Sequence, residues 1–219
     1  MNFNELINKA KACIFDMDGT LVDSLNIWKD IDKRFFLEHN MELPSDYDKR
    51  IAHMSFMEMA YFTKEEYNIK EDANEIASTW LQWSKEAYEN TIQLKPYALE
   101  LLRKLYDMNI PLSLATTNDE SLYLPCLKRL DIIKYFKYID NVNRLNTTKK
   151  EPKIYLHLSN KMKTKPEETI VFEDILMALT SAKEAGFLTC GVYDKANIKD
   201  MEKIIEKSDC FIENYKEVI

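Results

Sequence analysis

Short apolar runs, most of them separated by stretches with helical periodicity, constrain the fold of this chain more than any other feature. Compact runs of this kind predict buried strands, and helices between successive strands predict βαβ units. Strands joined in that way form a mainly parallel sheet, so the sequence predicts an α/β fold. The predicted strands are residues 11–16, 110–115, 135–139, 169–172, 188–192 and 210–212, and the clearest predicted helices are residues 98–108, 119–130, 154–163 and 176–185.

Residues 24–94 interrupt this alternation with helical patterns alone, such as the apolar stripe of Ile27, Ile31 and Phe35. We therefore expect two domains: a core of residues 1–23 and 95–219, and an inserted helical domain of residues 24–94. Ligands of open α/β sheets bind outside the carboxyl ends of the strands. Because the insertion leaves the core just after the first strand, we expect it to act as a cap over that edge.

Composition and charge exclude several classes of partner. No window approaches the roughly 20 apolar residues of a membrane span, and residues 1–10 are too polar for a secretory signal, so we expect a cytoplasmic protein without a membrane partner. The formal net charge of −7 gives no general attraction to phosphate backbones, so we expect no nucleic-acid partner. The four cysteines have no C-x-x-C spacing and are predicted to be buried free thiols.

The run Asp-Met-Asp-Gly-Thr follows the first predicted strand directly. Asp16 and Asp18 flank one residue, so both carboxylates can reach one site, while Gly19 permits a sharp turn. Two acids so close repel each other unless a cation neutralises them or one holds a proton. A D-x-D pair alone is equally compatible with a solvated acidic turn.

Four segments in order make the pattern far more specific. The first continues from D-x-D-G-T into Leu-Val-Asp-Ser, and the others are residues 112–118, 148–156 and 170–174. With them the chain resembles the haloacid dehalogenase superfamily, in its phosphatase and phosphomutase branch. The resemblance implies a Rossmann-like core, a helical cap and hydrolysis of a small phosphorylated metabolite through an aspartyl-phosphate. It makes Asp16 the nucleophile and Asp18 the acid that protonates the leaving oxygen and later activates water.

The second segment, Leu-Ser-Leu-Ala-Thr-Thr-Asn, is an apolar strand that ends in hydroxyls. By the resemblance Thr116 is catalytic and binds the phosphoryl oxygens, and the implied phosphate-binding set is Gly19, Thr116, Thr117, Asn118 and Lys149. A Thr-Thr-Asn run is also compatible with a cap for the helix that follows.

The third segment resembles the family pattern G-K-P-x-P-D-x-Y/F and makes Lys149 the catalytic lysine, a fixed cation for the nucleophile. The chain departs from the pattern, since Thr148 replaces the glycine, Lys150 the first proline and Lys153 the acid. Lys150 therefore competes for the role. The non-functional alternative is that these lysines form a solvated basic turn at the start of the next helix.

The fourth segment ends in paired acids, and the resemblance implies Mg²⁺ as the cofactor. Hard oxygen ligands suit this ion, with Asp174 the expected ligand and Glu173 an auxiliary one. The family continues with serine and then glycine, where this chain has Ile175 and Ala178. The implied metal-binding set is Asp16, Asp18, Glu173 and Asp174.

Three rival functions stay open. A sugar phosphomutase of the same branch is expected to carry a histidine where this chain has Trp28. A dehalogenase lacks the second aspartate, so Asp18 argues against it. A non-catalytic phosphate-binding protein on the same scaffold is the third. In this branch the substrate specificity is set by cap residues that vary freely, so the sequence does not identify the substrate. We expect a monomer.

Overall fold

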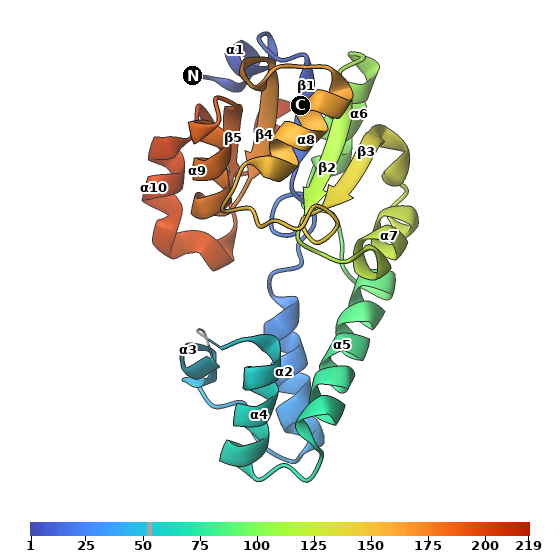
Figure 1. Ribbon diagram of the computed structural model, residues 1–219, viewed down its shortest axis with the longest axis vertical. Helices are drawn as coiled ribbons and strands as arrows, with labels where there is room; N and C mark the ends of the chain where they lie inside the picture. Colours follow the sequence, from blue (N-terminus) through green and yellow to red (C-terminus); the bar gives the residue numbers. More distant parts are fainter. Residues whose placement is uncertain (52–53) are drawn as a thin grey trace. The chain divides into compact units, whose positions relative to one another are not determined.

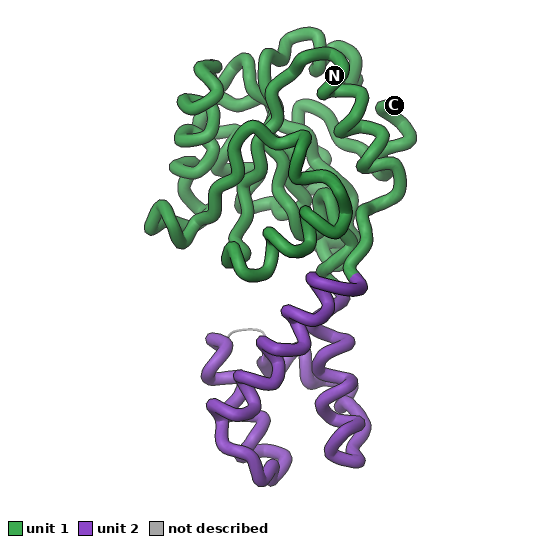
Figure 2. The backbone as a smooth tube through the Cα atoms, turned by 90° about the vertical axis from the view of Figure 1, so that its right-hand side faces the viewer, with its two compact units in different colours: residues 1–25, 92–219 green, residues 26–91 purple. Residues whose placement is uncertain are grey.

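A computed structural model of the protein describes residues 1–51 and 54–219 (Figure 1). The chain divides into two compact units, one of residues 1–25 with 92–219 and one of residues 26–91 (Figure 2). The predicted insertion is residues 24–94, of which Ala52 and His53 lie outside the described residues. The role of the smaller unit as a cap stays a prediction.

The larger unit is built on a six-stranded sheet in which every neighbouring pair of strands is parallel. Its order is β3-β2-β1-β4-β5-β6. This arrangement confirms the predicted α/β fold. The strands are β1 (Ala12–Phe15), β2 (Leu112–Thr116), β3 (Phe136–Asn141), β4 (Thr169–Glu173), β5 (Leu188–Val192) and β6 (Cys210–Ile212).

The strand order reverses at β1. From β1 the chain continues through β2 and β3 on one side, and β4, β5 and β6 lie on the other side. In open parallel sheets, the crevice at such a switch point, outside the carboxyl ends of the strands, is where ligands bind. The fold therefore predicts a ligand site at the residues that follow β1, β2 and β4.

Helices cover both faces of this sheet, which is why its central strands β1, β2 and β4 are buried at every residue rather than at alternate ones. On one face Ile14 packs in a buried cluster with Ile154 and Leu158 of α8, which lies in front of the sheet in Figure 1. On the other face Phe15 stacks on Phe172 at 4.2 Å between ring centroids. The helices of this unit are α1 (Phe3–Ile7), α6 (Ala98–Asp107), α7 (Glu120–Arg129), α8 (Lys153–Met162), α9 (Leu176–Glu184) and α10 (Met201–Lys207), with 3₁₀ turns η1 (Ile133–Tyr135), η2 (Pro166–Glu168), η3 (Lys195–Asp200) and η4 (Tyr215–Val218).

The smaller unit is helical in the part that the structure describes. Phe35 of α2 packs edge-on against Trp80 of α5, with ring centroids 5.5 Å apart. Ser55 and Asp72 begin α4 and α5 with capping boxes, which satisfy backbone N–H groups that a helix start leaves without partners. The helices are α2 (Ile27–Glu38), α3 (Tyr47–Ile51), α4 (Phe56–Tyr67) and α5 (Ala73–Asn90).

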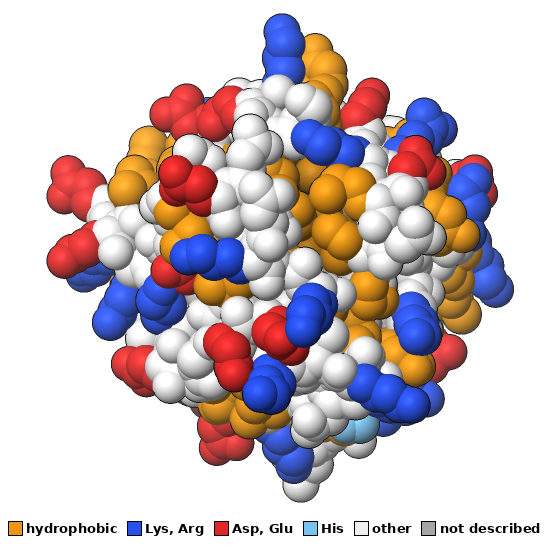
Figure 3. Space-filling view, turned by 90° about the horizontal axis from the view of Figure 1, so that it is seen from above, with side chains coloured by type: hydrophobic (Ala, Val, Ile, Leu, Met, Phe, Trp, Pro, Cys, Tyr) orange, Lys and Arg blue, Asp and Glu red, His pale blue; other side chains and the backbone are white. Residues whose placement is uncertain are grey.

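Two further expectations concern burial and surface. All four cysteines are buried free thiols, as predicted. No helix within residues 1–51 and 54–219 is long and apolar enough to cross a membrane. Basic and acidic side chains are interspersed over the face seen in Figure 3, so this face presents no extended region of one charge.

Candidate active site

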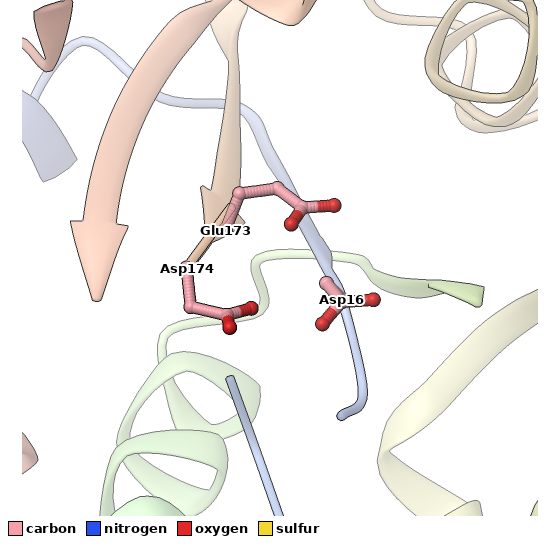
Figure 4. A group of neighbouring side chains, drawn as sticks. All are labelled: Asp16, Glu173 and Asp174. Atoms are coloured by element: carbon pink, nitrogen blue, oxygen red, sulfur yellow. The ribbon is translucent and has the colours of Figure 1, made fainter. Parts of the chain in front are cut away.

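Three carboxylates converge at the carboxyl ends of β1 and β4 (Figure 4). These strands pair in register up to Phe15 and Phe172, so the next residues, Asp16 and Glu173, lie side by side. Asp174 follows, and one oxygen from each of the three acids lies within 4.8 Å of the others. All three side chains are buried, with at most 4% of any of the residues exposed.

Lys149 supplies a positive charge to this group. Its Nζ donates to Asp16 Oδ1 and, at 2.5 Å, to Glu173 Oε1. Burial alone would lower the pKa of Lys149, but the charges of Asp16 and Glu173 outweigh it and raise the pKa above its ordinary value. The Ser181 hydroxyl donates to the Lys149 carbonyl at 2.8 Å and fixes the turn. Lys150 is exposed instead, and it lines a surface cavity.

One lysine does not balance three buried acids. Burial, and then the charge of Asp16, raises the pKa of Glu173 to about 7, although Tyr155 donates to its Oε1 at 2.7 Å. The same two causes raise the pKa of Asp174. Within the described residues, Asp16 Oδ2 and Glu173 Oε2 are buried without a hydrogen-bond partner. Unpartnered buried carboxylate oxygens and surplus negative charge fit a hard divalent cation such as Mg²⁺, for which Asp16, Glu173 and Asp174 would be the ligands.

The turn after Asp16 is shaped around Asp174. Gly19 has a φ of +79°, and a Cβ added there would lie 2.3 Å from Asp174 Oδ2. Thr20 Oγ1 donates to Asp174 Oδ1 at 2.9 Å, and Asn197 Nδ2 donates to Oδ2 at 2.6 Å. Glycine is therefore required at residue 19 both for the left-handed backbone and for the close approach of the carboxylate.

Asp18 occupies a separate position. Ser24 Oγ donates to its Oδ1 and Asn118 Nδ2 to its Oδ2, both at 2.6 Å. Its carboxylate is not in the three-acid group of Figure 4, because these two donors hold it. The turn after β1 separates the Asp18 carboxylate from the other three acids. The predicted part of Asp18 in metal binding stays a prediction.

Thr116 ends β2 and is buried, and its hydroxyl accepts a hydrogen bond from the Asn118 N–H at 3.0 Å. Thr117 is exposed. The alternative that Thr-Thr-Asn caps the next helix is wrong. Asp119 is the N-cap of α7, and its side chain accepts from the Ser121 N–H at 3.1 Å.

The residues that orient the predicted site residues were not themselves predicted from the sequence. Thr20 and Ser24 lie inside the first of the four segments that carry the family motifs, and Tyr155 lies inside the third. Their position in these motifs could have identified them as candidate site residues. Ser181 and Asn197 lie outside every motif. Only the fold brings them to Lys149 and Asp174.

Comparison with known proteins decides the family. The model of haloacid dehalogenase-like hydrolases matches residues 13–192, which include all four motifs. The chain belongs to this family. The haloacid dehalogenase resemblance drawn from the motifs is thereby confirmed.

Individual members of the family resemble this hydrolase along most of its length. A "Phosphorylated carbohydrates phosphatase" of Thermotoga maritima is 28% identical over 176 residues, which cover 80% of this chain and 82% of that protein. A "Validoxylamine A 7'-phosphate phosphatase" of Streptomyces hygroscopicus subsp. limoneus is 24% identical and covers 95% of both chains. A crystal structure from Thermotoga maritima, assigned as a beta-phosphoglucomutase, has 25% identity and a TM-score of 0.84 over 94% of this chain and 96% of that one.

Proposed function

We propose that this haloacid dehalogenase-like hydrolase is a Mg²⁺-dependent phosphatase that removes the phosphoryl group from a small phosphomonoester through an aspartyl-phosphate on Asp16. The observation that carries the proposal is the state of Asp16, a buried carboxylate with Lys149 on one oxygen and no hydrogen-bond partner, among the described residues, on the other. The named relatives support the substrate class, since two of them are phosphatases of small phosphorylated compounds.

In the first step one oxygen of Asp16 attacks the phosphorus atom, and the bond from phosphorus to the ester oxygen breaks. The leaving oxygen takes a proton from Asp18. Lys149 supplies a preorganised positive charge beside the attacking carboxylate, in a buried site where such charges act strongly. Bound Mg²⁺ would neutralise charge on the phosphoryl group.

In the second step Asp18 takes a proton from water, and the water oxygen attacks phosphorus. The bond between phosphorus and the Asp16 oxygen breaks, which releases inorganic phosphate and restores the carboxylate. Ser24 and Asn118 hold Asp18 for both proton transfers. We assign the phosphoryl oxygens to side-chain donors of Thr116, Thr117, Asn118 and Lys149. The N–H of Gly19, the fifth residue of the predicted set, already donates to the Val22 carbonyl at 3.0 Å.

A phosphomutase is the second candidate, because the fold matches a structure assigned as a beta-phosphoglucomutase. That reaction returns the phosphoryl group to the sugar instead of giving it to water. Trp28 stands where the mutase pattern is expected to have a histidine, which favours hydrolysis.

A panel assay tests the proposal. Purified protein is incubated with sugar phosphates and nucleoside monophosphates, with Mg²⁺ or with excess chelator, and inorganic phosphate is measured. We expect phosphate release from at least one substrate and its loss in chelator. Isomerised sugar phosphate without release of phosphate would support the mutase. No conversion of any substrate would support a non-catalytic phosphate-binding protein.

A further inference from the structure

Asp174 is oriented by a residue that no motif contains. Asn197 lies in η3, and its Nδ2 donates to Asp174 Oδ2 at 2.6 Å. Thr20 holds the other oxygen at 2.9 Å. Each carboxylate oxygen has two lone pairs, so both can accept these hydrogen bonds and still face a cation. Together the two donors fix the rotation of the carboxylate.

The segment that carries Asn197 is anchored to the core. The Asn197 N–H donates to the Asp194 carbonyl at 3.1 Å, and the Asp194 side chain accepts from the Ala196 N–H at 2.8 Å. Lys95 Nζ lies 2.9 Å from Asp194 Oδ2 and donates to the Tyr193 carbonyl at 2.6 Å. The Lys95 and Asp194 side chains are only 13% and 8% exposed, so this ion pair is shielded from solvent and holds the segment in place.

The chemistry of the amide suits this place. Asp174 lies in a group of three acids that has one lysine. A second cationic side chain at residue 197 would supply a hydrogen bond, but it would also cancel the charge that attracts a metal ion. Asparagine supplies the hydrogen bond without a charge.

We infer that Asn197 is a positioning residue for Asp174, which it holds in the orientation that binds the divalent cation. This inference rests on the proposed function, since it assumes a metal ion at the three acids. Residues that orient metal ligands typically contribute 10- to 100-fold to metal affinity.

The test uses substitutions that separate the hydrogen bond from packing. Asn197 lines a cavity of about 450 Å³, so alanine would leave room for water to replace the amide. Leucine has the same number of side-chain heavy atoms, branched at the same position, but it lacks the donor and excludes water. Ile198→Ala is the matched control, because Ile198 lies in the same η3 turn and is 61% exposed. If leucine prevents folding, Asn197→Val serves as the second variant.

Metal binding is measured without substrate. The free protein is titrated with Mn²⁺, a substitute for Mg²⁺ in oxygen-rich sites, and the free ion is followed by electron paramagnetic resonance. We expect a dissociation constant about 10- to 100-fold higher for Asn197→Leu than for the parent and unchanged for Ile198→Ala. A value for the leucine variant within threefold of the parent would overturn the inference alone. A parent that neither binds Mn²⁺ nor hydrolyses any phosphomonoester would overturn the proposed function, and the inference with it.

Discussion

Lys149 and Lys150 are neighbours in the chain but meet different surroundings. Lys149 is buried against Asp16 and Glu173, whereas Lys150 is exposed. We expect Lys149→Met to lower kcat/KM by about 10²- to 10³-fold, the usual effect of removing one preorganised electrostatic group. Lys150→Met is the control and should stay within a few-fold of the parent. The reverse order would mean that the catalytic turn is shifted by one residue.

Gly19 and Gly186 permit a second comparison at the residue scale. Both have positive φ, but a Cβ at Gly19 would overlap Asp174, whereas one at Gly186 would meet only Pro166, at 3.8 Å. We expect backbone strain from alanine at either position to reduce the free energy of unfolding by about 1–2 kcal/mol. Gly19→Ala should reduce it further, because its Cβ would also overlap Asp174. Only Gly19→Ala should also lose activity, by at least about tenfold, because it displaces Asp174. Equal activity losses in the two variants would contradict this account of the turn.

The residues proposed to perform the chemistry could be predicted more easily than those that orient them. Asp16 and Glu173 follow apolar runs, a pattern that the sequence alone shows. The donors to Asp174 come from Thr20 and Asn197, which are 154 and 23 residues away along the chain. No local pattern connects such distant positions, so only the packed fold reveals them.

At the scale of elements, α2 contains a buried acid that the proposed reaction does not use. Asp32 is 9% exposed and lies near Tyr47 and Asp48. Burial, and then the charge of Asp48, raises its pKa to about 7. Unfolded aspartate has a pKa of about 4, so the folded protein binds more protons between about pH 4 and pH 7. The stability contributed by protonated Asp32 is complete below about pH 4 and is lost as the pH rises through 7.

Asp32→Asn should therefore have a pH-dependent effect. At pH 8 we expect the variant to have a free energy of unfolding higher than that of the parent by on the order of 1–4 kcal/mol, as measured by denaturant unfolding. The difference should vanish near pH 4, where both side chains are neutral. A difference that does not change with pH would show that Asp32 titrates normally.

The bounds of the strands could also be predicted only in part. The predicted bounds of β5 and β6 match the structure, whereas β2 begins two residues later than predicted. Hydrophobicity placed Ile110 in the strand, but its N–H donates to the Leu105 carbonyl and completes the end of α6. Apolar patterns locate a buried segment well, and hydrogen bonding decides where it begins.

At the scale of the whole molecule, the three buried acids should make stability depend on the metal ion. A ligand that binds only the folded state stabilises it by mass action. We expect millimolar MgCl₂ to raise the melting temperature by a few degrees relative to NaCl of equal ionic strength, since one kcal/mol corresponds to about 2–4 °C in a protein of this size. Identical melting curves in the two salts would contradict a Mg²⁺ site at these acids.

The central claim, that Asp16 becomes phosphorylated, is tested most directly by trapping the intermediate. Protein turning over a radiolabelled phosphomonoester is quenched with acid, digested and mapped by mass spectrometry. The account predicts label on the peptide that contains Asp16. It also predicts none in Asp16→Asn, whose turnover should fall by about 10³-fold or more. Label on another residue, or turnover by Asp16→Asn within tenfold of the parent, would contradict it.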